Sequence, residues 1–531
     1  MKQLIKGFNW GLTGEVQDML VEYGRVVARG PELGIPSETT RIDLTGKWLL
    51  PSFVESHCHI LPTGLDLLKL HLGFAENHQD VLDSVRERFN EQPEGWIHAV
   101  HYDQNRYAGI HITRDQVDAI SRSRPIVLRH VNGHASIANS AALEAAGIGE
   151  DVQDPVGGTY VRDEAGRLNG VLLEAAHEFV AAAAPKPSRS EMVEAILRAG
   201  KLMHSQGIGC ATDMMTGFFN LEDELASYQL AAEAGSPIHM RLFVQWNEVF
   251  GPRAAPEMVE RIRSLTHGSP SRPDRGKDVR VAGIKIFADG AIGSGTAAIY
   301  GKFLGERKAG VTRSRRGEDL ARGPERETDG QLMYSIDRLN KMVETAHNAG
   351  FVVAVHSIGD YSTDLVMNAF ERTGEPSRHR IEHAMLLSDA QIERMARLQL
   401  HCTFQPEFLK RLGPAYRRQL GEDRTAFLIR SRSVLDAGIP MSFSSDRPIV
   451  AGNPWDGIEA ASNRPKGFSP TENCTREEAI LAYTAGGALA NGEPDLMGTL
   501  NPGSLADFQL YAKSPVHDAI ELAVLNQDHE V

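Results

Sequence analysis

The chain has 531 residues, enough for roughly two to four ordinary domains or for one α/β barrel with insertions. Apolar residues make up 41% and charged residues 24%, as in soluble globular proteins. The net charge of −14 excludes nucleic acid and anionic membranes as expected partners. The four cysteines are widely spaced without a disulfide or zinc-ribbon pattern, and no long apolar segment indicates export or a membrane span. We therefore expect a cytoplasmic protein.

The two ends of the chain have the same pattern of short β-like runs and glycine turns. Residues 18–30 are predicted to form a hairpin with Gly24 near its turn, and residues 503–513 show the same alternation. We expect the ends to pair in one small β-sandwich domain around a larger barrel. The predicted boundaries are residues 1–50 plus 490–531 for the sandwich and 51–489 for the barrel.

The segment PSFVESHCHI, residues 51–60, places two histidines at the end of a predicted strand. Side chains two residues apart on a strand share one face, so His57 and His59 point the same way. Paired imidazoles on one face are suited to a metal ion. A surface pair of histidines also arises by chance, and the segment alone does not decide between the two interpretations.

Seven further short apolar segments follow this first strand, and helix-like stretches separate several of them. Eight strands that alternate with helices predict a parallel sheet and, with eight repeats, a (β/α)₈ TIM-type barrel. The seven predicted strands cover residues 208–215, 238–246, 281–290, 351–357, 378–384, 400–406 and 440–446.

One of the intervening helices has clear start and stop signals. Ser335 is a suitable N-cap, and Gly350 is a suitable C-terminal stop. The spacing of the apolar residues predicts one buried face. That face is expected to contain Ile336, Leu339, Val343 and Ala346.

Two segments depart from the alternation of strands and helices. About 120 residues separate the first two barrel strands, too many for one crossover connection. We interpret residues of about 65–190 as a lobe inserted after the first strand. The second segment, residues 305–330, is charged, rich in glycine and poor in apolar residues, which predicts a mobile loop.

Six side chains able to bind a metal recur at the ends of the predicted strands: His57, His59, Lys285, His356, His383 and Asp446. Strand ends of one polarity converge at one mouth of a barrel. Taken singly, either later histidine is more often a buried structural residue, and the aspartate can simply cap a turn. The lysine is more informative, because its neighbours are apolar and a buried cation is costly unless it is paired or modified.

Several blocks of the sequence resemble the metal-dependent amidohydrolase superfamily. More narrowly, the chain resembles the amidohydrolase 3 family, in the branch that contains the N-substituted formamide deformylases. The resemblance runs from about residue 4 to the end. The blocks that carry it are LLPSFVESHCHI at the first strand, then GIKIFADGAIGSGTAAI, VAVHSIGD, RHRIEHA and SSDRPI, and the closing GSLADF. Two blocks in the lobe, YDQNRYAGIHITRDQVD and VNGHASIANSAAL, also match.

This resemblance implies a barrel that holds one or two divalent metal ions, usually zinc. His57 and His59 would bind the more buried ion, and Asp446 would bind a metal and take a proton from the attacking water. Lys285 would be carboxylated on its side-chain nitrogen and would bridge two ions. The histidines of the later strands, His356 and His383, would bind the second ion. Nitrogen and oxygen ligands also accept manganese, iron or cobalt, so the identity of the metal stays open.

Four further residues are candidates for contact with the substrate. His134 can hydrogen-bond a substrate carbonyl or, equally, cap the helix that follows it. Asp289 can orient the site or close a turn after the strand that carries Lys285. Trp96 and Asp103, both in the lobe, are weaker candidates.

The sequence predicts a hydrolase that cleaves a carbon–nitrogen bond of a linear or cyclic small-molecule amide with metal-activated water. A mononuclear deaminase and a lactone hydrolase of the same superfamily are the alternatives, and Lys285 favours the amidase. A catalytically silent scaffold is an alternative of another class, although such a protein would be expected to lose metal ligands. The oligomeric state stays open, with a homodimer as a common arrangement.

Overall fold

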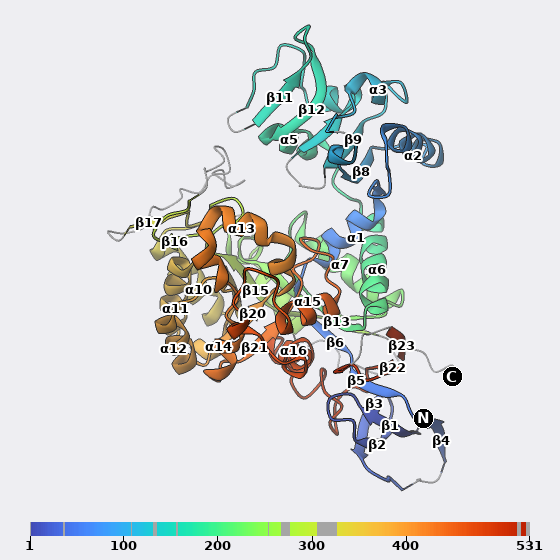
Figure 1. Ribbon diagram of the computed structural model, residues 1–531, viewed down its shortest axis with the longest axis vertical. Helices are drawn as coiled ribbons and strands as arrows, with labels where there is room; N and C mark the ends of the chain where they lie inside the picture. Colours follow the sequence, from blue (N-terminus) through green and yellow to red (C-terminus); the bar gives the residue numbers. More distant parts are fainter. Residues whose placement is uncertain are drawn as a thin grey trace. The chain divides into compact units, whose positions relative to one another are not determined.

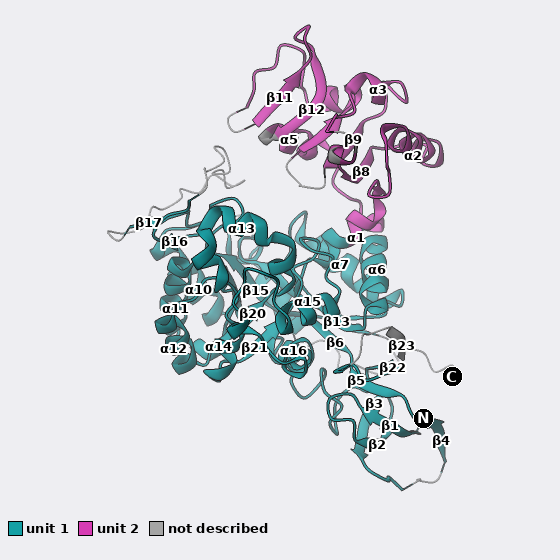
Figure 2. Cartoon of the chain, viewed as in Figure 1, with its two compact units in different colours: residues 1–63, 192–306, 318–531 teal, residues 64–191, 307–317 magenta. Residues whose placement is uncertain are grey.

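The computed structural model describes residues 2–34, 38–107, 109–130, 135–155, 158–252, 254–266, 277–304, 327–517 and 522–526 (Figure 1). The chain divides into two compact units (Figure 2). Unit 1 comprises residues 1–63, 192–306 and 318–531, and unit 2 comprises residues 64–191 and 307–317. The helices α1 (Ile60–Leu68) and α6 (Arg189–Ser205) span two of the boundaries between the units.

Unit 1 contains a parallel sheet of eight strands that pair in the order of the chain. These strands are β6 (Phe53–Cys58), β13 (Ile208–Thr216), β14 (His239–Gln245), β15 (Val279–Phe287), β18 (Val353–Ser357), β19 (Arg380–His383), β20 (His401–Phe404) and β21 (Met441–Phe443). Every predicted barrel strand overlaps one of them. The prediction of a (β/α)₈ barrel is therefore confirmed.

The first and last strands meet and bring the sheet close to a closed barrel. The Ser56 hydroxyl donates a hydrogen bond to the Phe443 carbonyl at 3.1 Å. Just beyond β21, the backbone N–H of Asp446 donates to the His57 carbonyl at 2.8 Å. All residues of β6, β19, β20 and β21 are buried, because helices or other side chains cover both faces of a parallel sheet.

Helices follow most barrel strands in unit 1. They are α7 (Leu221–Glu233), α8 (Trp246–Phe250), α9 (Met258–Thr266), α10 (Ile336–Asn348), α11 (Asp360–Glu371), α12 (Asp389–Leu398), α13 (Glu407–Ala426), α14 (Ser431–Asp436), α15 (Pro454–Ser462), α16 (Arg476–Tyr483) and α17 (Ala485–Ala490). Among the described helices, none is at once long enough and apolar enough to cross a bilayer.

Helix α10 confirms the predicted capping and corrects one residue of the predicted face. The Ser335 hydroxyl accepts a hydrogen bond from the Arg338 N–H. Gly350 has a positive φ of 91°, as expected for a glycine that ends a helix. The buried residues are Leu339, Met342, Val343 and Ala346. Ile336, the first residue of the helix, is 36% exposed and lies outside the buried face.

Both ends of the chain contribute to a second, seven-stranded sheet in unit 1. The predicted hairpin is present as β2 (Val16–Glu22) and β3 (Arg25–Gly30). The sheet branches at β1 (Lys2–Trp10), which pairs with β2 on one side and with β4 (Thr39–Asp43) and β5 (Trp48–Pro51) on the other. The C-terminal strands β22 (Phe508–Tyr511) and β23 (Leu522–Asn526) extend it through β5.

A group of ion pairs connects this sheet with the barrel. Lys277, just before β15, lies 2.7 Å from a carboxylate oxygen of Asp507, just before β22. The His239 ring lies between two carboxylates, with Nδ1 2.5 Å from Asp278 and Nε2 3.4 Å from Asp507. These contacts fix the end of the barrel where β14 and β15 begin.

Unit 2 contains a six-stranded sheet in the order β11-β12-β10-β9-β8-β7. Alternate residues of β9 enter different hydrophobic clusters: Ile126 and Leu128 belong to one, and Val127 belongs to the other. The sheet is therefore buried on both faces. Its elements are β7 (Leu70–His71), α2 (His78–Glu91), β8 (Ile97–Tyr102), α3 (Arg114–Asp118), β9 (Ile126–His130), β10 (Ala135–Ala138), α4 (Ser140–Ala145), β11 (Gly158–Arg162), β12 (Leu168–Glu174) and α5 (Ala175–Ala183).

The predicted mobile loop falls mostly outside the described residues, which exclude positions 305–326. For its last residues the prediction of a loop is wrong. Thr328 and Asp329 form β17, which pairs antiparallel with β16 (Ile299–Tyr300). Backbone hydrogen bonds to β16 give this polar stretch an extended structure that its composition does not indicate.

Candidate active site

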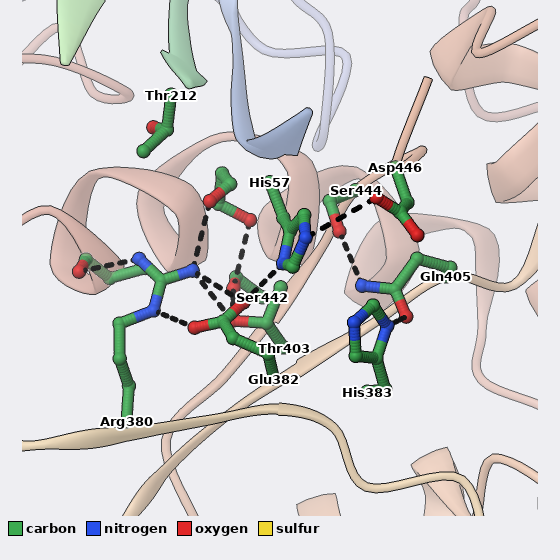
Figure 3. Close-up of polar contacts among 12 residues, drawn as sticks. His57, Thr212, Arg380, Glu382, His383, Thr403, Gln405, Ser442, Ser444 and Asp446 are labelled. Carbon is green, nitrogen blue, oxygen red and sulfur yellow. Dashed lines mark hydrogen bonds and ion pairs between the residues drawn. The ribbon is translucent and has the colours of Figure 1, made fainter. Parts of the chain in front are cut away.

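Three predicted metal ligands converge where β6 and β21 end. Oδ1 of Asp446 lies 2.9 Å from Nε2 of His59. The same oxygen lies 3.3 Å from Nε2 of His57, a contact drawn in Figure 3. All three side chains are buried, and one ligand atom of each lies within 4.8 Å of the others. Oδ1 of Asp446 has no hydrogen-bond partner among the described residues, and the close approach of the three ligand atoms is suited to a cation.

The two histidines of β18 and β19 extend this cluster. The His383 ring centroid lies 4.7 Å from that of His57 and 4.5 Å from that of His356. His383 and the neighbouring Ala384 have positive φ values of 75° and 39°, which non-glycine residues rarely adopt. This backbone turn brings the ring of His383 between the rings of His57 and His356.

Hydrogen bonds fix the orientation of three imidazoles and leave one nitrogen of each available. Nδ1 of His57 lies 2.5 Å from Oε2 of Glu382, and Nδ1 of His383 lies 2.8 Å from Oε1 of Gln405 (Figure 3). Nε2 of His356 lies 3.0 Å from the Gly290 carbonyl. These contacts leave Nε2 of His57, Nε2 of His383 and Nδ1 of His356 as the nitrogens that can bind a metal, and Nε2 of His57 already faces Asp446.

Glu382 is a functional residue that the sequence interpretation missed. Arg380 contacts both of its carboxylate oxygens, at 2.5 and 3.1 Å. Burial alone would raise the pKa of the Glu382 carboxyl, but the charges of Arg380 and His57 outweigh it and hold the pKa well below its usual range. An ionised carboxylate therefore faces Nδ1 of His57. The sequence offered one signal for this residue, because Glu382 stands two positions after Arg380 in a short predicted strand.

Glu55 and Gln405 were also missed. The Glu55 carboxylate is fully buried and accepts hydrogen bonds from the backbone N–H groups of His57, at 3.2 Å, and Ser445, at 3.0 Å. It therefore joins the two segments that carry the ligands of β6 and β21. Gln405 stands directly after β20 and donates to the Ser444 hydroxyl at 3.0 Å. A polar residue directly after β20, which carries no predicted ligand, was a usable signal.

Lys285 is almost completely buried, with 1% of its surface exposed. Within the described part of the chain its Nζ has no hydrogen-bond partner. Burial lowers the pKa of the ammonium group to about 8, although Glu382 and Asp446 act in the opposite direction. More of this side chain is therefore the neutral amine near neutral pH than in an exposed lysine, and the neutral amine is the form that reacts with carbon dioxide.

Asp446 is ionised at neutral pH. Burial alone would raise the pKa of its carboxyl, but His57 and His59 outweigh it and hold the pKa well below the usual range. The residue has a φ of 56°, so the backbone turns sharply at this position. The turn directs a charged carboxylate back toward the two histidines of β6.

Asp289 is used inside the fold, which favours the turn-closing role over contact with a substrate. Its carboxylate accepts four hydrogen bonds of 2.7–3.0 Å, and burial raises the pKa of the group to about 6. The donors are the backbone N–H groups of Ala298, Ile358 and Gly359 and the Ser362 hydroxyl. Asp289 thus joins the segment after β15 to the start of α11.

Two of the candidate substrate-contacting residues in unit 2, Trp96 and Asp103, contact other residues of unit 2. The Trp96 ring stacks on the His98 ring, with centroids 5.6 Å apart and planes 9° apart. An Asp103 oxygen lies 3.6 Å from Nε2 of His130. His134 is outside the described residues. Contact of these three residues with a substrate stays a prediction.

Replacing Glu382 with glutamine is expected to weaken metal binding by about 10- to 100-fold, because the charge that orients His57 is lost. Metal affinity can be measured by competition with a fluorescent chelator. Glu478→Gln is the matched control, since Glu478 pairs with Arg432 at 2.7 Å outside the ligand cluster. Equal affinity of the Glu382 variant and the parent would contradict this role.

Comparisons with known proteins agree with this geometry. The amidohydrolase family profile Amidohydro_3 matches residues 40–522. The YtcJ protein of Bacillus subtilis (strain 168) is 29% identical over 492 residues, covering 90% of this chain and 86% of that protein. The N-substituted formamide deformylase of Arthrobacter pascens is 26% identical over 523 residues, covering 94% of this chain and 90% of that enzyme.

A solved structure shares the fold over almost the whole chain. The crystal structure of an uncharacterized metal-dependent hydrolase from Pyrococcus furiosus superposes with a TM-score of 0.76 at 24% identity. The match covers 97% of this chain and 100% of that chain. With the family profile extending over most of the sequence, the protein is a hydrolase that belongs to the amidohydrolase 3 family of the metal-dependent amidohydrolase superfamily.

Proposed function

We propose that the protein cleaves the carbon–nitrogen bond of a linear or cyclic small-molecule amide with water, using one or two divalent metal ions. The observation that carries the proposal is the convergence of His57, His59 and Asp446 at one strand edge of the barrel. The nearby His383 and His356 supply two more free imidazole nitrogens. Carboxylate and imidazole donors of this kind are typical of catalytic zinc.

The donor groups fit two ions. Nε2 of His57 and His59 would hold the first ion, and His356 and His383 would hold the second. Asp446 would ligate a metal. When bound, a divalent cation supplies a Lewis acid for the substrate carbonyl and lowers the pKa of coordinated water.

Lys285 fits this arrangement as a carbamate. Its neutral amine adds to carbon dioxide, forming an N–C bond and releasing one proton, so the buried amine becomes an anion. The buried Nζ without a hydrogen-bond partner among the described residues supports this assignment. A carbamate would offer two oxygens for two ions and would remove the cost of burying an unpaired ammonium group.

Asp446 is the proposed proton carrier. As an ionised carboxylate it accepts the proton of the attacking water, and as the acid it then delivers this proton to the leaving nitrogen. The amide is thereby converted to a carboxylic acid and an amine. Glu382 and Gln405 act through the histidines, whose ring orientation they fix.

The amide class is supported by the relative from Arthrobacter pascens, whose name states that it removes formyl groups from N-substituted formamides. Lactone hydrolysis is the second candidate, because a polarised carbonyl accepts water whichever group leaves. Mononuclear deamination is less well supported, because it gives the buried Lys285 no role.

The proposal can be tested with 4-nitroformanilide, which releases coloured 4-nitroaniline on hydrolysis, beside panels of cyclic amides and lactones. We expect hydrolysis of at least one amide, loss of activity after treatment with 1,10-phenanthroline and recovery with zinc. The metal content should be measured by mass spectrometry at each stage.

The protein with zinc restored and the parent protein serve as internal controls for damage during chelation. Hydrolysis of lactones alone would replace the amide assignment. Metal binding without hydrolysis in any panel, or no metal binding at all, would favour a silent scaffold.

A further inference from the structure

Apolar side chains stand beside the ligands at two of the strand ends. Phe287 is the last residue of β15, two positions after Lys285. Because alternate residues of a strand share a face, the two side chains lie on the same side of the sheet, with Phe287 nearer the carboxyl end. The ring centroid of Phe287 lies 5.0 Å from Nζ of Lys285 and 5.3 Å from the ring centroid of His356.

Phe287 differs from its strand neighbours in exposure. Ile284, Lys285 and Ile286 are all buried, whereas Phe287 is only partly buried. Phe287 is therefore partly accessible to solvent at the carboxyl end of β15. The carboxyl ends of the strands are where the metal ligands lie and where substrates enter barrels of this kind.

A second apolar residue lies close to Asp446. The backbone N–H of Ile449 donates to the Asp446 carbonyl at 3.0 Å, so the four residues form a tight turn. The Ile449 side chain is 55% exposed. An apolar side chain thus stands one turn from the proposed proton carrier, at the end of another strand of the same barrel.

We propose that Phe287 and Ile449 form an apolar wall of the substrate site, which selects amides that carry an aryl or other large apolar substituent. The inference rests on the proposed function and narrows its substrate class. Ligand sites are mostly apolar surfaces with a few placed polar groups, and the wall supplies the apolar part beside the ligands. A substrate with only small polar groups would leave both side chains in contact with water.

Phe287 has one alternative role, which is to shield Lys285. The ring contact with Nζ would then serve the lysine, and its loss would change the metal content rather than the choice of substrate. For this reason the test compares two ligands on the same variant and records the metal content of each sample.

The experiment uses zinc-loaded full-length protein and two matched pairs of probes. Rates are compared for 4-nitroformanilide and N-methylformamide, and binding by calorimetry is compared for benzohydroxamate and acetohydroxamate. Each pair keeps one reacting or chelating group and changes the apolar substituent. Phe287→Ala is expected to lower the preference for the aromatic member of each pair by about 10- to 100-fold, and Ile449→Ala by a smaller factor.

Phe427→Ala is the control, because Phe427 is 49% exposed at the end of α13 and has no assigned role in the site. Equal losses for both members of each pair, or a preference unchanged in both variants, would overturn the inference. A loss of metal in Phe287→Ala with an unchanged preference would assign the residue to the shielding of Lys285. If neither amide is hydrolysed, the proposed function fails. The ratio of the two hydroxamate affinities still tests whether Phe287 and Ile449 form an apolar wall.

Discussion

Replacing Lys285 with alanine is expected to lower the metal content from about two ions per chain to one or fewer and to abolish most of the activity. The lysine is 1% exposed, and its amine has no hydrogen-bond partner among the described residues. If the group is a carbamate, its removal takes away the one proposed ligand able to contact both ions. Elemental analysis of the purified variant beside the parent measures the effect directly.

Lys277→Ala is the matched control for this variant. Lys277 precedes the same strand, but its ammonium group pairs with Asp507 at the opposite end of β15. Its loss should leave the metal content unchanged. One ion per chain in the parent, unchanged in the Lys285 variant, would make Lys285 a structural residue and would favour a mononuclear hydrolase or deaminase.

Asp446→Asn is expected to reduce kcat by about 10²- to 10⁴-fold, the usual contribution of a general acid or base. Asparagine keeps the shape of the side chain, and the backbone hydrogen bond from residue 446 to the His57 carbonyl does not involve the carboxylate. The variant should therefore fold. It retains an amide oxygen as a weak ligand but cannot carry the proton from water to the leaving nitrogen.

The rate of 4-nitroaniline release and the metal content together separate the two roles of this residue. Asp456→Asn serves as the control, because the ion pairs of Asp456 among the described residues are long, at 3.7 Å to Lys410 and 3.9 Å to Arg411. Activity of Asp446→Asn within about twofold of the parent, at equal metal content, would exclude Asp446 as the proton carrier.

The barrel could be predicted from the sequence because its strands are buried on both faces and read as short apolar runs between helices. The ligands could be located because they stand where those runs end, as at His356 and His383. The exposure of Ile336 could not be predicted, because helical spacing gives a face but does not show where the neighbouring surface stops.

The residues that orient the ligands were harder to predict, because they act across the barrel. Glu382 and His57 are 325 positions apart, and only the closure of the sheet brings them into contact. Asp289 shows the opposite case, since its position after Lys285 suggested a role in the site. One of its four donors follows β15 and the other three lie at the start of α11, two segments that the sequence alone does not place together.

The meeting of β6 with the segment after β21 has a consequence for biosynthesis. A chain emerging from the ribosome carries His57 and His59 from the start, but Asp446 follows only after most of the polypeptide has been made. Until then a metal finds two imidazoles without the third ligand of its site. The site formed by His57, His59 and Asp446 is therefore completed late, because a polypeptide that ends before residue 446 lacks one of the three ligands of this cluster.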